Sequence, residues 1–101
     1  MNTYKKGKLL ENKAEQKLKE LGYSIYFKSI RIRFQSVDFA GLFDIVASKD
    51  KRWYFIQVKS RFDRKQWDKI QQWAIQKAPT NSHSEMWVWN EHMSEFDIHT
   101  I

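Results

Sequence analysis

The stretch that decides the fold is Phe43-Asp44-Ile45-Val46-Ala47-Ser48, then Lys49-Asp50-Lys51-Arg52, then Trp53-Tyr54-Phe55-Ile56-Gln57-Val58-Lys59. Both apolar runs are rich in β-branched and aromatic residues, and the segment between them is charged, which predicts two strands joined by a tight turn. A hairpin symmetric about Asp50 and Lys51 pairs residues whose numbers sum to 101. In this register three pairs face each other: Ser48 and Trp53, Val46 and Phe55, and Asp44 and Gln57.

One face of this hairpin combines an acid, an amide and an amine. Lys59 lies two residues beyond Gln57, so both side chains point from the same face of the strand as Asp44. Trp53 and Phe55 share that face, which is therefore apolar near the turn and polar at the other end. A solvent-facing Asp–Lys pair is the alternative interpretation, but the mixed character of the face favours the floor of a functional cleft.

The composition predicts one basic domain that spans residues 1–101. An apolar content of 42% is enough for a single core. Lys and Arg number 18 against 12 acids, which gives a net charge of +6. This excess favours a polyanionic partner such as nucleic acid, although basic residues that serve only solubility are the alternative.

Several classes of protein are disfavoured. The chain has no cysteine, which excludes disulfides and thiolate metal sites. No apolar run approaches the ~20 residues that span a bilayer, so we expect no membrane partner. The basic segment Met1–Lys8 is not followed by an apolar signal segment, and we therefore expect an intracellular, cytoplasmic protein.

The first element is predicted to be a helix from Tyr4 to Leu21, stopped by Gly22. Its inward stripe consists of Leu10, Ala14, Lys17, Leu18 and Leu21. Glu11 falls on the shoulder of this stripe. From spacing alone, a solvated glutamate is the favoured interpretation, and a carboxylate that reaches around the core edge toward a sheet is the alternative.

A strand is predicted at 23–27, continuing after a break into 30–34. The second piece alternates, with Ile30, Ile32 and Phe34 on a core face and Arg31 and Arg33 opposite. The arginine face suits phosphate contact and plain solubility equally well. Residues 35–42 are predicted to form a loop.

A second helix is predicted after Asp63, which forms an N-cap, with Gln66 placed to complete a capping box. Its inward stripe consists of Trp67, Ile70, Trp73, Ala74 and Lys77. The segment 86–90 reads as a strand that is apolar on both faces, internal or at a subunit contact, and 96–101 as a last strand. The predicted class is α/β, in the order helix, three strands, helix, two strands.

The oxygen ligands Asp44, Gln57 and Glu11, with the amine of Lys59, suit a site for Mg²⁺ or Mn²⁺. Such sites usually serve phosphoryl chemistry. The three histidines His83, His92 and His99 match no zinc signature, and we expect them at the surface. The tryptophans could stack on single-stranded bases, but their spacing favours core packing.

Three short motifs resemble the PD-(D/E)xK nuclease superfamily, most like the small archaeal Holliday-junction resolvases and related archaeal-virus nucleases. These motifs are Lys6-Gly7 with Glu11, Asp44-Ile45-Val46-Ala47, and Gln57-Val58-Lys59-Ser60. The resemblance covers about residues 5–75 and implies a restriction-endonuclease-like fold with a mixed central sheet flanked by helices. It also implies hydrolysis of DNA phosphodiesters and, as in the resolvases, a homodimer.

The resemblance also implies residue roles. Glu11, Asp44 and Gln57 surround the metal with the Val58 carbonyl, and Lys59 serves the attacking water. Gln57 stands where the family usually has an acid, a known variation. Since a charge pair at ~4 Å is worth about 4 kcal/mol at an effective dielectric of 20, we expect weaker metal binding than with glutamate. A smaller departure is Phe43 in place of the motif's proline.

Basic residues near both helix starts and on the arginine face are natural phosphate contacts, with a solvated face as the alternative. They are Lys5, Lys6, Lys8, Arg31, Arg33, Arg61, Arg64, Lys65 and Lys69.

We therefore expect a metal-dependent DNA endonuclease, with branched DNA as one candidate substrate. The alternatives are a catalytically inactive DNA-binding module of the same fold and a structural interaction protein built on the Trp-rich last third. The sequence leaves open whether the substrate is a junction, an end, a nick or a single strand, and whether cleavage is endo- or exonucleolytic.

Overall fold

The computed structural model describes residues 3–32 and 35–101, with side chains described at 5–30 and 37–101. Its elements are α1 (Thr3–Glu20), β1 (Ser24–Lys28), β2 (Ile30–Ile32), β3 (Gln35–Val37), β4 (Ile45–Lys49), β5 (Arg52–Lys59), α2 (Arg64–Gln76), β6 (Ser82–Asn90) and β7 (Glu95–Thr100). Among the described residues, neither helix is long and apolar enough to cross a membrane.

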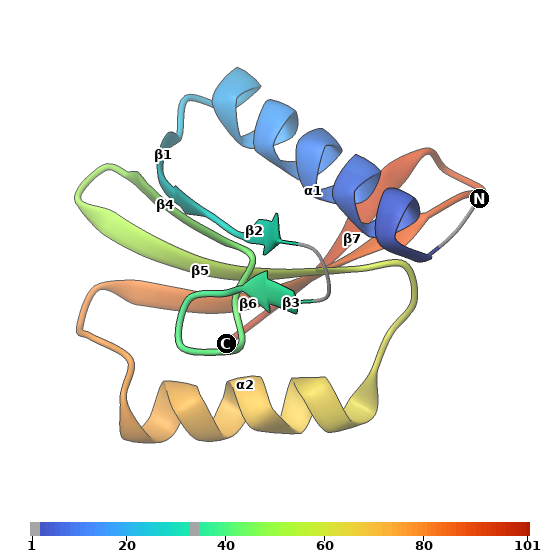
Figure 1. The fold of residues 1–101 in the computed structure, drawn as a ribbon. Coiled ribbons are helices and arrows are strands. Elements are labelled where there is room, and N and C mark those ends of the chain that lie inside the picture. Colours follow the sequence, from blue (N-terminus) through green and yellow to red (C-terminus); the bar gives the residue numbers. More distant parts are fainter. Residues whose placement is uncertain (1–2, 33–34) are drawn as a thin grey trace.

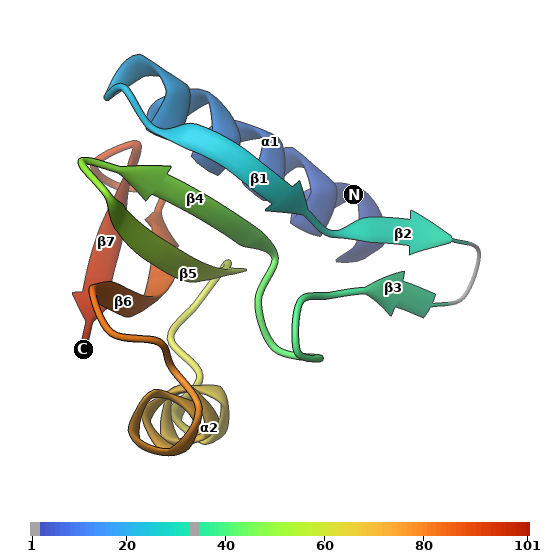
Figure 2. The ribbon, with the colours of Figure 1, turned by 90° about the vertical axis from the view of Figure 1, so that its left-hand side faces the viewer.

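A mixed five-stranded sheet forms the centre of the molecule, with α1 on one face and α2 on the other (Figures 1 and 2). The strand order is β1-β4-β5-β6-β7. Among the strand pairs of the described residues, only β5 and β6 run parallel, because α2 carries the chain between them. The predicted α/β class is confirmed, and the arrangement is compatible with a restriction-endonuclease-like fold.

The predicted hairpin register is confirmed for β4 and β5. Val46 pairs with Phe55 and Ser48 with Trp53, in the antiparallel sense. Only Asp50 and Lys51 lie between the last paired residues, and their φ angles of 54° and 64° give a left-handed turn. Such turns follow the twist of the strands they join, so the loop of two residues holds the register.

Two apolar layers cover the two faces of the sheet. On the α1 side the buried cluster consists of Ala14, Leu18, Ile45, Ala47, Ile56 and Trp87. On the α2 side it consists of Leu42, Phe43, Val46, Phe55, Ile70, Met86 and Val88. Successive residues of β4 and β5 therefore alternate between the layers, as the period of a strand requires.

The α1 stripe is confirmed at Leu10, Ala14 and Leu18, which are buried. The prediction was wrong for Lys17 and Leu21, which are exposed, since Leu21 lies beyond the end of the helix. Gly22, with φ of 90°, ends the helix as predicted.

The predicted capping residue of α2 is confirmed, because Asp63 accepts a hydrogen bond from the Gln66 backbone N–H at 3.1 Å. Ile70 is fully buried, and Trp67, Trp73 and Ala74 are half-buried. Lys77 was wrongly placed in the inward stripe; it is exposed at the end of the helix.

Residues 35–37 do not belong to a loop. They form β3, which pairs with β2 in a separate two-stranded sheet. Ile30 is 57% exposed, so its placement on a core face was wrong, because this ribbon lies outside the main sheet. The predicted faces of Arg33 and Phe34, and of the side chains of Arg31 and Ile32, lie outside the described residues.

The predicted strand 86–90 is confirmed as internal. It is the second half of β6, which begins at Ser82 and lies between β5 and β7. Trp87 is 2% exposed and belongs to the core of this chain itself.

Two isoleucines of α2 provide a matched test of the core. Ile70 is fully buried and Ile75 is 84% exposed. We expect Ile70→Ala to lower the free energy of unfolding by about 2–5 kcal/mol, because a cavity is left between α2 and the sheet. Ile75→Ala should change it by less than about 0.5 kcal/mol. Urea unfolding followed by circular dichroism measures both, and equal effects would contradict the packing.

Candidate functional site

Asp44 lies where the regular pairing of β4 with β5 stops. The last pair is Ile45–Ile56. Asp44 donates its backbone N–H to the Ile56 carbonyl at 2.8 Å, and its Oδ2 accepts from the Val58 N–H at 2.7 Å. Asp44 is thus hydrogen-bonded to Ile56 and Val58, the residues before and after Gln57. These backbone contacts, rather than regular strand pairing, hold its carboxylate beside Gln57.

Glu11 of α1 is 2% exposed, so its interpretation as a solvated glutamate was wrong. The Ser29 hydroxyl donates to Glu11 Oε1 at 2.7 Å, while the Ser29 backbone N–H donates to the Asp44 carbonyl, also at 2.7 Å. Ser29 therefore connects the two acids. The sequence reasoning missed this role; the available signal was a hydroxyl residue at the break between two predicted strands.

Gln57 is 7% exposed and its carboxamide has a defined orientation. Nε2 donates to the Leu42 carbonyl and to Gln66 Oε1, both at 2.9 Å. A backbone carbonyl only accepts, so the nitrogen must face Leu42 and the oxygen must point the other way. Among the described residues, that buried Oε1 has no hydrogen-bond partner.

Lys59 extends from β5 to the first turn of α2. Its side chain is 32% exposed, and Nζ lies 3.6 Å from Asp63 Oδ2. The Gln66 backbone N–H lowers the pKa of the Asp63 carboxyl, and Lys59 lowers it further. Asp63 therefore stays ionised well below neutral pH and holds the ammonium group at the end of β5.

The donor set fits a hard divalent cation. Glu11 and Asp44 offer buried carboxylates, and Gln57 offers a buried carbonyl oxygen, which are the ligand types that Mg²⁺ and Mn²⁺ take. Within the described ranges, no group of three or more His, Cys, Asp or Glu residues could hold a metal ion. A cation at this place would therefore depend on the amide oxygen of Gln57.

Both helices begin at the end of the molecule toward which β5 runs (Figure 1). The predicted phosphate contacts there are exposed: Lys5, Lys6, Lys8, Arg61, Arg64, Lys65 and Lys69. Arg64 pairs with Asp68 at 3.3 Å, but both side chains are more than half exposed, so this pair leaves the guanidinium accessible. Arg33 and the side chain of Arg31 lie outside the described residues.

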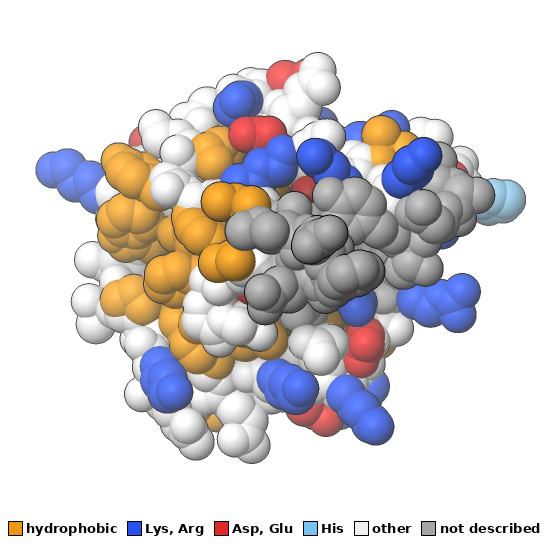
Figure 3. Space-filling model, in the orientation of Figure 1, with side chains coloured by type: hydrophobic (Ala, Val, Ile, Leu, Met, Phe, Trp, Pro, Cys, Tyr) orange, Lys and Arg blue, Asp and Glu red, His pale blue; other side chains and the backbone are white. Residues whose placement is uncertain are grey.

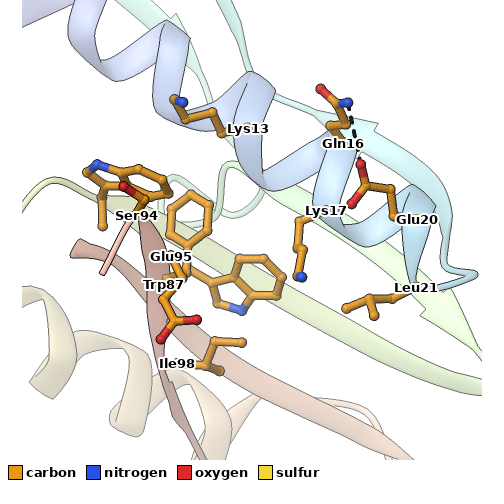
Figure 4. Close-up of a pocket in the computed structure, with 11 residues that line it drawn as sticks. Lys13, Gln16, Lys17, Glu20, Leu21, Trp87, Ser94, Glu95 and Ile98 are labelled. Carbon is orange, nitrogen blue, oxygen red and sulfur yellow. Dashed lines mark hydrogen bonds between the residues drawn. The ribbon is translucent and has the colours of Figure 1, made fainter. Parts of the chain in front are cut away.

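Two hollows lie elsewhere on the surface. One, of about 380 Å³, lies between α1 and the β6–β7 pair, where Lys13 Nζ lies 4.9 Å from the centroid of the Trp89 ring and Lys17 and Trp87 also line the hollow (Figure 4). The other, of about 370 Å³, belongs to an apolar surface that is visible in Figure 3. It is lined by Tyr26, Phe27, Phe39, Val46, Trp53, Phe55 and Pro79. Neither hollow is lined by a predicted site residue. The candidate site is therefore defined by its polar contacts and not by a pocket.

The histidines take part in aromatic packing or lie exposed. His83 stacks on Tyr54 with ring centroids 5.1 Å apart, and His99 contacts Phe62 and Trp67. Both are half-buried, so their placement at the surface was only partly right, whereas His92 is exposed.

The element order and the mixed sheet are compatible with the α/β fold of restriction-endonuclease-like proteins. No protein-family model matches the chain. Over 93 residues it is 31% identical to a UPF0102 protein of Sulfurihydrogenibium sp. (strain YO3AOP1), and the match covers 81% of this chain and 76% of that protein. The chain belongs to the UPF0102 family, whose fold is of the PD-(D/E)xK-like nuclease type.

The bridge between the two acids gives a stability prediction. Ser29→Ala removes the hydroxyl that donates to buried Glu11. We expect the free energy of unfolding to fall by roughly 1–3 kcal/mol, the usual cost of removing a donor from a buried acceptor. Ser48→Ala, at a half-buried position of β4, is the control. Equal changes in the free energy of unfolding for the two variants, measured by urea unfolding, would contradict a stabilising role of the bond between Ser29 and Glu11.

Proposed function

We propose that this protein is a metal-dependent DNA endonuclease that hydrolyses phosphodiester bonds. The observation that carries the proposal is the carboxamide of Gln57. Its oxygen is buried and without a partner among the described residues, and its orientation is fixed by two acceptors. A buried carbonyl oxygen without a partner is costly, and a cation between it and the two carboxylates would offset that cost.

Glu11, Asp44 and Gln57, with the Val58 carbonyl, would hold Mg²⁺ or Mn²⁺. When bound, such an ion polarises a phosphoryl oxygen and makes water a better nucleophile. The chain itself contributes fixed ligands, because Ser29 and the β5 backbone orient the two carboxylates.

Lys59 would serve the attacking water. An ammonium group donates hydrogen bonds but cannot accept them, so Lys59 would bind the oxygen of the water or the developing charge on the phosphate. Its contact with Asp63 keeps the group at the end of β5, while its exposure of about one third leaves a path to substrate.

DNA is the proposed substrate because the protein carries a net charge of +6. The exposed lysines and arginines at both helix starts suit phosphate contacts, which carry no base information. By analogy with the archaeal resolvases, we include branched DNA and action as a homodimer inside the cell in the proposal. Trp87 is buried in its own core, so a dimer would use another surface than the β6 face.

The alternative function is a DNA-binding module without cleavage. It is favoured by the neutral amide at position 57, which leaves the described site with two carboxylates rather than three acids. Weak metal binding would then leave only the electrostatic affinity for DNA.

A cleavage assay separates the two functions. We expect cleavage of plasmid and oligonucleotide DNA with Mg²⁺ or Mn²⁺ and none with EDTA. Asp44→Asn and Lys59→Ala should each reduce the rate by roughly 100-fold or more while DNA binding persists. Asp97→Asn and Lys77→Ala, both at exposed positions, are the matched controls. Salt-sensitive DNA binding without cleavage under any metal would support the module instead.

The same assay on a panel of DNA shapes identifies the substrate. The panel contains a four-way junction, a duplex end, a nicked duplex and a single strand of the same sequence. Faster cleavage of the junction supports branched DNA, and equal rates on all four would remove that part of the proposal.

The amide at position 57 gives a metal-binding prediction. We expect Gln57→Glu to tighten Mn²⁺ binding by roughly tenfold, since part of the added charge interaction survives desolvation. Gln71→Glu adds the same charge at an exposed position of α2 and should leave affinity unchanged. Calorimetric titration measures both, and no gain for Gln57→Glu would remove this idea.

A further inference from the structure

We propose that the first turn of α2 orients the site, with Gln66 as the positioning residue for Gln57. The inference rests on the proposed role of Gln57 as an oxygen ligand. It goes beyond that role because Gln66 belongs to none of the three short motifs, and its action would pass entirely through another side chain.

The contacts of Gln57 leave its carboxamide one arrangement. Both N–H groups of Nε2 are used, one by the Leu42 carbonyl and one by Gln66 Oε1, each at 2.9 Å. Leu42 alone fixes which end of the amide is nitrogen, but a single bond leaves the group free to turn about it. The second bond, to Gln66, removes this freedom and fixes where Oε1 points.

The position of Gln66 follows from the helix cap. Its backbone N–H donates to Asp63 at 3.1 Å, which makes it the third residue of the first turn. In a capping box the side chain at this position turns back to the capping residue. Here the Gln66 side-chain oxygen instead accepts a hydrogen bond from Gln57 on β5. The residue that the helix cap positions therefore contacts the site.

The same turn also holds Lys59, through Asp63 at 3.6 Å. Gln57 and Lys59 are alternate residues on one face of β5, while Asp63 and Gln66 are three apart and lie on one side of a helical turn. One helical turn thus contacts both of these side chains of the strand.

This arrangement also explains why position 57 holds an amide. Leu42 and Gln66 both present oxygen acceptors to Nε2. A glutamate at 57 would place a carboxylate oxygen against the Leu42 carbonyl. The Gln66 side-chain amide could turn over and donate to this carboxylate, but the Leu42 backbone carbonyl can only accept. The glutamine at 57 is thus matched to its neighbours in the metal-free protein, and the tighter Mn²⁺ binding expected of Gln57→Glu is the net effect after this repulsion is subtracted.

Three variants test the inference. Gln66→Leu removes the acceptor at similar size, Gln66→Glu keeps an acceptor at the same reach, and Gln72→Leu is the control at an exposed position of the same helix. Calorimetry measures Mn²⁺ affinity. The NMR signals of the Gln57 side-chain NH₂ group report its hydrogen bonds without metal, and thermal unfolding checks that each variant folds.

We expect Gln66→Leu to weaken Mn²⁺ binding roughly 10- to 100-fold, as loss of an outer-shell contact usually does, with faster exchange of the Gln57 NH₂ protons. Gln66→Glu should restore most of the affinity, and Gln72→Leu should match the wild type. Unchanged affinity and unchanged NH₂ exchange in folded Gln66→Leu would overturn the positioning role alone. A wild-type protein that binds no Mn²⁺ would instead overturn the proposed metal function.

Discussion

The backbone contact between Asp44 and β5 is the constraint on which the site depends. The β4–β5 pairing stops at Ile45, and Asp44 bonds to the residues on either side of Gln57. This contact brings the carboxylate of the residue just before β4 beside an amide of β5. Ser29 then joins Glu11 of α1 to the same point. Three elements meet there, so the loss of this contact would separate the proposed oxygen ligands.

The hairpin could be predicted because its information is local. Two runs of β-branched and aromatic residues on either side of a charged turn predict a strand register, and the register is confirmed up to Ile45. The burial of Glu11 could not be predicted, because an angle on a helix gives a shoulder position but not what packs against it. The contact between Gln57 and Gln66 was missed for the same reason: it joins a strand to a helix through tertiary packing.

The short ribbon of β2 and β3 shows a different limit. Strands of three residues carry little periodicity, so 35–37 looked like a loop, and Ile30 was assigned to a core that this ribbon does not cover. At the start of α2 the local structure was predicted correctly, but a tertiary role was missed. Asp63 and Gln66 were correctly predicted to begin a helix, yet the same two residues also contact the site.

Whether a cation binds beside Gln57 can be measured by the anomalous diffraction of Mn²⁺ soaked into crystals of the wild-type protein. We expect a single strong peak within ligand distance of Gln57 Oε1 and of the carboxylates of Glu11 and Asp44. A peak elsewhere, for example beside the exposed acids of β7, with none near Gln57, would contradict it. In that case the buried amide oxygen, which has no partner within the described part of the chain, would need another explanation, and the nuclease proposal would lose its main support.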